Sequence, residues 1–232
     1  MIHFDKVSKR YGREAAKDAI FAVEDVTLSI EPREFVTIVG HSGAGKTTLL
    51  KLILAEERPT AGIVTLDSIN LHKLRNKDMT RLRRRIGTVF QDFRLIPDKT
   101  TFENVAFAME ACGRTDREIA ADVPHVLSLV GLENKMTRFP RELSGGEKQR
   151  VAIARAIVNH PDILIADEPA GNLDPENTFE IVNILQRING MGTTIILATH
   201  NAGIIDAVGK RVVTMEKGKV AHDTKHHGHK KA

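Results

Sequence analysis

The stretch that decides the fold reads Phe35-Val36-Thr37-Ile38-Val39-Gly40-His41-Ser42-Gly43-Ala44-Gly45-Lys46-Thr47-Thr48-Leu49-Leu50. It begins as an apolar run typical of a buried strand, passes through a loop that carries three glycines, and continues as an apolar helical segment. The loop matches the pattern G-x-x-x-x-G-K-[ST], which indicates a phosphate-binding loop when a strand precedes it and a helix follows it. A chance glycine loop in an α/β protein is the alternative, and the joint occurrence of strand, loop, Lys-Thr pair and helix disfavours it. The stretch therefore predicts binding of a nucleoside triphosphate.

The residue types in this loop suit a polyphosphate. Glycines let the backbone turn so that successive N–H groups point inward at the β-phosphate, and the helix that follows adds its positive N-terminal end. Lys46 supplies a full positive charge toward the β and γ oxygens, and Thr47 offers a hydroxyl to Mg²⁺. The residues expected to contact the nucleotide here are Gly40, His41, Ser42, Gly43, Ala44, Gly45, Lys46, Thr47 and Thr48.

The composition limits the classes of protein to which the chain can belong. The chain has 232 residues, of which 41% are apolar and 28% charged, as in an ordinary globular protein with one large α/β domain. No run approaches the roughly 18 apolar residues that a membrane span needs. The N-terminal segment 1–7 reads as a strand and lacks the features of a signal peptide, and a single cysteine, Cys112, fits a reducing compartment. We expect an intracellular protein without an integral membrane segment.

Two segments are strongly basic. The first contains Lys73, Arg75, Lys77, Arg81, Arg83, Arg84 and Arg85, opposed only by Asp78. A solvated helix face is the commoner explanation of such a run, and a patch for lipid or nucleic acid is the alternative. The second is the histidine- and lysine-rich C-terminal tail, which has no apolar residue to bury and is expected to be disordered from about residue 221.

Alternation and capping patterns predict the remaining elements. Segments 2–4 and 21–30 alternate as half-buried antiparallel strands do, and segments 62–66 and 86–90 also read as strands. The region from about 100 to 160 is expected to be helical, because Thr100, Thr115 and Ser144 each precede a glutamate by three residues, as in a capping box. Tyr11, the only tyrosine, either packs against the strands or stacks on adenine.

Polar residues follow two further buried strands. The apolar run 163–166 ends in Asp167 and Glu168, and the run 194–199 ends at His200. In open α/β sheets ligands bind beyond the carboxyl ends of the strands, so we expect Asp167 to hold Mg²⁺, Glu168 to orient or deprotonate the attacking water, and His200 to face the same cleft. Asp174, followed by Pro175, is a candidate N-cap of the next helix.

Together these motifs resemble the ATPase subunits of ABC transporters, in the family's order and over nearly the whole chain. The resemblance rests on Tyr11, segment 40–48, Gln91, Leu143-Ser144-Gly145-Gly146-Glu147, segment 163–168, Asn172-Leu173-Asp174 and His200. Ser144 is expected to cap a helix whose free N–H groups form an anion site without a lysine of its own. Two departures from the family pattern, Ala170 in place of a hydroxyl residue and Glu147 in place of the commoner Gln, remove no catalytic group.

The resemblance implies a head-to-tail dimer that encloses two ATP molecules with Mg²⁺. Its signature residues Ser144, Gly145, Gly146 and Glu147 would contact the partner's nucleotide, and Asp174 would also lie at the nucleotide. Gln91 would sense the metal and the attacking water. The implied fold is an α/β P-loop NTPase core of the RecA-like type at about 1–90 and 160–220, with an antiparallel β subdomain, an inserted α-helical subdomain at about 91–159 and a tail at about 221–232.

Within that family, Asp92-Phe93-Arg94-Leu95 and Gly171-Asn172-Leu173-Asp174 are most similar to the branch that acts in bacterial cell division. That similarity implies an integral membrane partner of the FtsX type, a place on the cytoplasmic face of the membrane, a signal to cell-wall hydrolases, other cell-division proteins as further partners, and no nucleic-acid partner. An ATPase of a lipoprotein-releasing or macrolide-exporting system is the alternative. Phe93, Leu95 and Ile96 are expected either to pack into the helical subdomain or to contact the membrane partner.

Overall fold

The structure is a computed structural model that describes residues 1–12 and 20–227. The chain forms two compact units, Met1–Arg83 together with the chain from Ile196 onward, and Arg84–Ile195. Strand β8 (Thr194–Thr199) begins in the second unit and ends in the first. A search of the described part of the chain for a helix long and apolar enough to cross a bilayer found no such segment.

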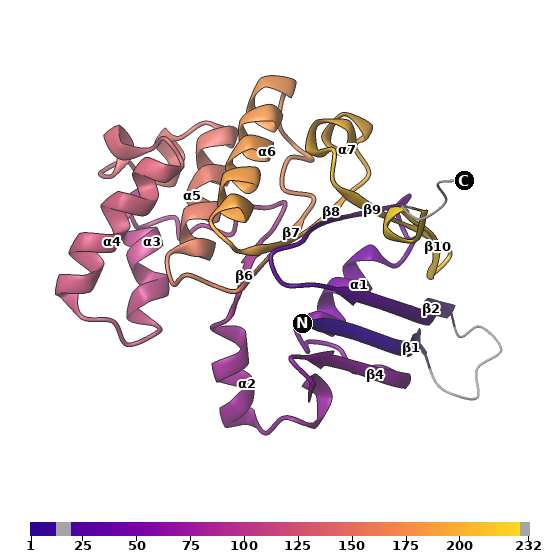
Figure 1. Cartoon of the computed structure of the whole chain (residues 1–232). Coiled ribbons are helices and arrows are strands. Elements are labelled where there is room, and N and C mark those ends of the chain that lie inside the picture. The colour runs from indigo at the N-terminus through magenta and orange to yellow at the C-terminus, as the bar shows by residue number, and fades with distance from the viewer. Residues whose placement is uncertain (13–19, 228–232) are drawn as a thin grey trace. The chain divides into compact units, whose positions relative to one another are not determined.

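The first unit contains an antiparallel sheet with the order β2-β1-β4-β5 (Figure 1). Its strands are β1 (Ile2–Tyr11), β2 (Ile20–Ile30), β4 (Ala61–Leu66) and β5 (Ile69–Asn70). Ile2 and Phe4 alternate with exposed neighbours, and an irregularity in the pairing after Phe4 lets Val7, three residues on, be buried as well. The predicted antiparallel pairing of the N-terminal strands is confirmed, with Ile2 opposite Ile30 and Phe4 opposite Leu28.

The same unit carries the strand and helix on either side of the glycine loop. Strand β3 (Phe35–Val39) pairs in parallel with β9 (Arg211–Glu216), which pairs antiparallel with β10 (Lys219–Asp223). The first four residues of β3 are all buried, as expected for a strand covered on both faces. The helices of this unit are α1 (Lys46–Ile53), α2 (Asn76–Arg83), α7 (Ala202–Val208) and the 3₁₀ turns Leu71–Lys73 and Thr224–His227.

The start of the expected disordered tail, at about residue 221, was placed too early in the sequence. Strand β10 continues to Asp223, and a 3₁₀ turn covers Thr224–His227. The sequence argument missed this because Asp223 is a charged residue that becomes buried by pairing with Arg211 rather than by apolar packing. Residues 228–232, the rest of the expected tail, lie outside the described part of the chain.

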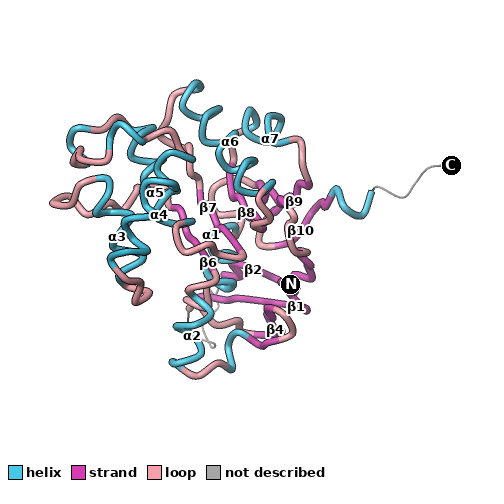
Figure 2. The backbone as a smooth tube through the Cα atoms, turned by 60° about the vertical axis from the view of Figure 1, so that its left-hand side comes forward, coloured by secondary structure: helices cyan, strands magenta, loops and turns pink. Residues whose placement is uncertain are grey.

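The second unit combines a parallel strand pair with helices. Strand β6 (Ile86–Val89) pairs with β7 (Ile163–Asp167) in parallel register. The helices are α3 (Thr101–Glu110), α4 (Asp116–Leu129), α5 (Gly145–Ile157), α6 (Pro175–Gly190) and the 3₁₀ turns Glu133–Lys135 and Pro140–Glu142. Helices α3, α4 and α5 contact one another and lie together in both views (Figures 1 and 2).

The predicted helix starts in the second unit are confirmed. Thr100, Thr115 and Ser144 each accept a hydrogen bond from the backbone N–H three residues on, and the glutamate at that position returns the bond to the cap residue's N–H. Asp174 likewise caps α6, with Pro175 in its first turn. The cap chemistry fixes these boundaries because it satisfies N–H groups that have no partner within the helix.

Candidate functional site

The glycine loop is pressed against the backbone of its own unit. A Cβ at Gly40 would lie 2.4 Å from the carbonyl oxygen of Met215, and one at Gly45 would lie 2.2 Å from that of Ala22. Gly45 also has a φ of 103° and is the N-cap residue of α1. Both positions therefore require glycine, through close approach as well as backbone conformation.

Lys46 opens helix α1 and is folded over this loop. Its side chain is 7% exposed, and its Nζ donates to the carbonyl oxygen of Gly40 at 2.6 Å and more weakly to that of His41 at 3.4 Å. The ammonium thus lies against the loop backbone, where it suits the phosphate groups that the motif predicts. Thr47, the next residue, is exposed, and its hydroxyl is an oxygen donor of the class that Mg²⁺ takes.

Two further predicted residues belong to the same unit. Tyr11 ends strand β1 opposite Ile20 and is 41% exposed, with the Nζ of Lys9 at 5.0 Å from its ring centroid. The pKa of the nearby Glu57 is lowered, chiefly by the hydrogen bond from Lys9 and to a smaller extent by Tyr11. The exposed ring favours stacking over the packing alternative. His200 follows strand β8 and is exposed, directly before Asn201, which caps α7.

The second unit carries the two carboxylates at the end of a buried strand. Strand β7 ends at Asp167, and Glu168 follows with a φ of 49°, in the left-handed region that glycine favours. Its carbonyl oxygen accepts from the N–H of Gly171, which closes a turn after the strand. Such strain in a residue with a Cβ is commonest at functional sites, where it aims a side chain. Both carboxylates are half-buried.

Gln91 lies against this turn. Its side-chain Nε2 donates to Oδ1 of Asn172 at 3.2 Å, and a Cβ on Gly171 would come within 3.0 Å of the same nitrogen. The structure therefore brings Gln91 close to the segment that follows Glu168, although 77 residues separate them in sequence from 91 to 168. That proximity links the end of β6 to the end of β7.

The start of α5 packs on α6. A Cβ at Gly146 would overlap Oδ1 of Asn177 at 1.8 Å, whereas one at Gly145 would meet only Leu173 at 3.3 Å. The glycine at 146 thus makes room for α6, and Gly145 has more open space beside it. The carboxylate of Asp174 holds Asn177 in place, because Oδ1 accepts from the backbone N–H of Asn177 at 2.9 Å and Oδ2 accepts from its Nδ2 at 2.6 Å.

Ser144 and Glu147 are engaged with each other at this helix start. Ser144 Oγ accepts from the N–H of Glu147 at 3.2 Å, and Glu147 Oε2 accepts from the N–H of Ser144 at 2.8 Å. That backbone bond and the nearby Lys135 lower the pKa of the Glu147 carboxyl. The helix start therefore keeps a carboxylate, balanced by Lys135, beside its free N–H groups.

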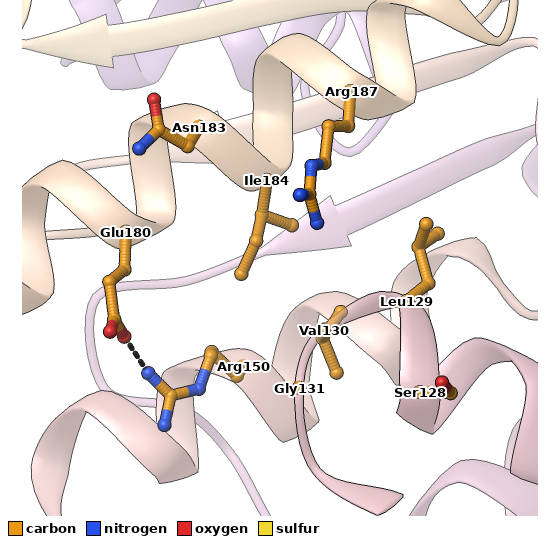
Figure 3. A pocket seen from close by; sticks show the side chains of 9 residues that line it. All are labelled: Ser128, Leu129, Val130, Gly131, Arg150, Glu180, Asn183, Ile184 and Arg187. Carbon is orange, nitrogen blue, oxygen red and sulfur yellow. Dashed lines mark hydrogen bonds and ion pairs between the residues drawn. The ribbon is translucent and has the colours of Figure 1, made fainter.

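A separate pocket of about 310 Å³ opens between the end of α4 and the helices α5 and α6 (Figure 3). An ion pair between Arg150 and Glu180 crosses it, with Arg187 nearby on α6. Its lining residues are Ser128, Leu129, Val130, Gly131, Arg150, Glu180, Asn183, Ile184 and Arg187. None of the predicted site residues lines this pocket.

The predicted site residues are divided between the two units. The loop 40–48, Tyr11 and His200 belong to the first unit, and Gln91, Asp167, Glu168, Asp174 and segment 144–147 belong to the second. Sequence reasoning missed Gln149 and Arg155 of α5, whose side chains bind the backbone around Gln91. The available signal for Arg155 was its place in the otherwise apolar run 151–157, whereas Gln149, flanked by Lys148 and Arg150, gave none.

The family model described as ABC transporter matches residues 23–171. The chain is 52% identical over 202 residues to the cell division ATP-binding protein FtsE of Streptococcus pneumoniae serotype 2, covering 87% of this chain and 88% of that one. It is 48% identical over 223 residues to FtsE of Mycobacterium tuberculosis, with 96% and 95% covered. The methionine import ATP-binding protein MetN 2 of Bacillus cereus is 46% identical over 226 residues, with 97% and 66% covered.

Solved structures agree. A dimeric post-hydrolysis state of the ATP-binding cassette MJ0796, bound to ADP and Pi, has a TM-score of 0.85 and 35% identity, covering 96% of this chain and 97% of that one. These similarities span the glycine loop, the helix start at Ser144 and the carboxylates after β7. The chain therefore belongs to the ABC transporter family and has the fold of its cassettes.

Proposed function

We propose that the chain binds and hydrolyses ATP as the nucleotide-binding subunit of an ABC complex in bacterial cell division. The observation that carries this proposal is the loop 40–48, in which two glycines are fixed by close backbone approach and Lys46 is held over the loop. Identity of 48–52% to two FtsE proteins supports the cell-division assignment.

Each site residue has a role in the proposed reaction. The loop amides and Lys46 bind the β- and γ-phosphates, and Tyr11 stacks on the base. Thr47 and Asp167, with Gln91, supply oxygen ligands to Mg²⁺, which when bound neutralises charge on the phosphate oxygens. Glu168 orients the attacking water and accepts its proton, and His200 contacts the γ-phosphate side of the site.

A second copy of the chain completes each site. The start of α5 has no lysine among residues 144–147, so its free N–H groups suit the terminal phosphate of a nucleotide held by another copy. Related cassettes have been solved as dimers, one of them after hydrolysis. In this proposal two ATP molecules are enclosed head to tail, each between the loop 40–48 of one copy and the start of α5 of the other.

The complex also needs a membrane subunit. With no spanning helix among the residues that the structure covers, the chain would reach the membrane through an FtsX-type integral partner at the cytoplasmic face. Closure and opening of the dimer would pass a conformational signal through that partner to cell-wall hydrolases, with other division proteins as further contacts.

A methionine importer is the second candidate, favoured by the 46% identity to MetN 2 over 226 residues. The two candidates share the chemistry of the ATPase and differ in the membrane partner. Affinity capture of the chain from native membranes, followed by identification of the co-purified integral protein, separates a division-type partner from an importer.

The ATPase proposal is tested with a pair of variants. Glu168→Gln keeps the shape of the side chain and loses its basicity, so we expect ATP affinity to stay and hydrolysis to fall by at least about a hundredfold. An ATP-bound dimer should then accumulate on size-exclusion chromatography. Lys46→Ala should instead lose ATP binding. Wild-type turnover in either variant would contradict the assigned roles.

A further inference from the structure

Helix α5 holds the backbone on both sides of Gln91. The Nε2 of Gln149 donates to the carbonyl oxygen of Phe90 at 3.3 Å, just before Gln91. Arg155, two turns further along the same helix, donates to the carbonyl oxygens of Phe93 at 2.9 Å and Arg94 at 2.6 Å, just after it. One rigid helix therefore fixes the segment 90–94 at both ends.

The second contact secures an unfavourable backbone conformation. Phe93 and Arg94 have φ values of 56° and 49°, two consecutive left-handed residues that both carry a Cβ. In this conformation their carbonyl oxygens point toward Arg155, whose planar guanidinium donates to two acceptors from one fixed fork. Without that fork, this connection would relax to ordinary backbone angles and carry Gln91 with it.

Stability alone does not explain either side chain. The bonds that the structure gives the half-buried guanidinium of Arg155 go to carbonyl oxygens rather than to a carboxylate, and its burial lowers the pKa of the group. Gln149 is fully buried, and its Oε1 has no hydrogen-bond partner among the residues the structure covers. The buried Oε1 of Gln149, without a partner in the described part of the chain, is a cost that packing alone would not favour.

Helix α5 begins beside Ser144, at the residues proposed to meet the partner's nucleotide. From Ser144 to Arg155 the helix rises by about 16 Å. We propose that Gln149 and Arg155 are positioning residues that couple the start of α5 to Gln91, so that a displacement of the helix moves the segment 90–94 and its glutamine together. This inference rests on the proposed function, because it assigns Gln91 a part in hydrolysis.

The far end of the same connection has its own anchor. Asn104 is fully buried, accepts from the N–H of Ile96 and donates to the carbonyl oxygens of Ile96, Lys99 and Thr100. Asn104 belongs to α3, so the connection is held to one helix near Gln91 and to another beyond residue 95. The contacts that Gln149 and Arg155 make next to Gln91 are therefore the ones that fix the position of this glutamine.

The experiment compares Arg155→Gln with Arg150→Gln, the same change on the same helix at the ion pair with Glu180. We expect Arg155→Gln to lower kcat for ATP about ten- to a hundredfold with KM within about twofold, because the misplaced group acts at the reacting end while the phosphate loop is untouched. Arg150→Gln should lower the melting temperature and leave kcat near the wild-type value.

A rescue variant separates positioning from loss of stability. Adding Arg94→Gly to Arg155→Gln makes a left-handed residue at 94 free of steric cost and should restore much of the turnover, while Arg94→Gly alone keeps kcat close to wild type. Arg155→Lys, which has the charge without the fork, should be intermediate. If the double variant regains melting temperature but not kcat, turnover does not depend on the backbone conformation of residues 93 and 94, and the positioning role of Arg155 fails.

Hydrogen–deuterium exchange gives a readout that needs no hydrolysis. In Arg155→Gln the amides of 90–95 should exchange faster while those of 40–50 stay unchanged. Unchanged exchange at 90–95, or faster exchange with wild-type kcat, would overturn the coupling. If the wild-type chain proves to have no ATPase activity, the proposed function fails, and the exchange result alone decides whether α5 holds this segment.

Discussion

A single cation, Arg211, joins three strands and the loop before β3 in the first unit. Its guanidinium donates to both carboxylate oxygens of Asp223 at 2.9 and 2.6 Å, to Glu34 at 3.0 Å and to the carbonyl oxygen of Ser29 at 2.8 Å. The side chains of Arg211 and Asp223 are each 7% exposed. The arrangement satisfies the donors of a guanidinium fork well, and it makes Arg211 the nearer of the two cations that Glu34 contacts, since Lys225 lies at 3.8 Å.

Replacing Arg211 with Met should be strongly destabilising. The apolar side chain fills the space but leaves the buried Asp223 without its counter-charge and Glu34 with only Lys225 at 3.8 Å, a loss of about 3–5 kcal/mol. Chemical denaturation of the two proteins measures it. Lys219→Met removes an exposed pair with Glu24 and serves as the control, with an expected change below about 1 kcal/mol. Equal losses in the two variants would contradict the role assigned to Arg211.

Residue-level chemistry could be read from the sequence where the partners are neighbours along the chain. Lys46 and the caps at Thr100, Ser144 and Asp174 were predicted because the partners of each lie within about six residues. The bonds from Arg155 to residues 93 and 94 span 62 and 61 positions. No periodicity or motif specifies a pairing of that length, so it could not have been predicted.

Helix starts behave as independent electrostatic elements. The pKa of Glu147 is lowered by the N–H of Ser144 and by Lys135. The pKa values of Glu103 and Glu118 are likewise lowered, chiefly by the backbone N–H of Thr100 and of Thr115. A carboxyl whose folded pKa is below its unfolded value of about 4.3 adds stability above that value and loses it as the pH falls through the folded pKa.

Glu147→Gln should therefore make unfolding less sensitive to acid. The amide can still accept from the N–H of Ser144 but loses the charge and the ion pair with Lys135, so the free energy of unfolding near pH 7 should fall modestly and should then decline less steeply below about pH 4.3. Denaturation curves at a series of pH values between 3 and 7 measure the difference. Parallel pH profiles for the two proteins would show that the cap carboxylate adds nothing to acid stability.

The large apolar side chains of the connection 91–100 are neither fully buried nor fully exposed. Phe93, Leu95 and Ile96 are half-buried, so the structure decides neither for a subdomain core nor for a partner surface. Their backbone is fixed by Arg155 and Asn104. The side chains can therefore change without releasing the connection, which makes them suitable probes of the membrane partner.

Leu95→Asp should weaken association with the membrane subunit and spare the isolated chain. Burial of a leucine in a partner groove contributes about 1.5–3 kcal/mol, which corresponds to at least about a tenfold loss of affinity. Titration against the detergent-solubilised partner measures this, with ATP binding and melting temperature as checks. Met191→Asp, at a 65% exposed position after α6, is the control. A lower melting temperature with unchanged partner affinity would place Leu95 in the core.

At the scale of the whole molecule, the sequence predicted the class and order of elements better than their grouping. The expected core and helical insertion were divided at about 90 and 160, whereas the compact units divide at Arg83 and within β8. Strands β6 and β7, which read as core from their apolar pattern, group with the helices. That division depends on how many contacts form between segments that are distant in sequence, and a local sequence pattern does not contain this information.

The proposed sharing of each site between two copies of the chain leads to a prediction about mixtures. Ser144→Arg should block turnover without weakening ATP binding by the monomer, because residue 144 would serve the nucleotide held by the other copy. Lys46→Ala has the opposite defect, losing binding at its own loop. Each variant alone should be inactive, since both sites of its homodimer carry a lesion.

In a dimer of one Ser144→Arg copy and one Lys46→Ala copy, the two lesions fall on the same composite site. The other site then combines an intact loop 40–48 with an intact start of α5. A mixture of the inactive proteins should therefore regain ATPase activity, up to about half the wild-type activity per heterodimer if the sites act independently, because one of two sites is intact. Subunit exchange followed by native mass spectrometry gives the fraction of heterodimer against which the rate is scaled.

A fully inactive mixture with heterodimers present would mean that each chain completes its own site or that neither site turns over alone. A heterodimer with Glu168→Gln in one copy and a wild-type second copy distinguishes these two explanations. Retention of about half the activity there would exclude strict coupling and leave a site built within a single chain.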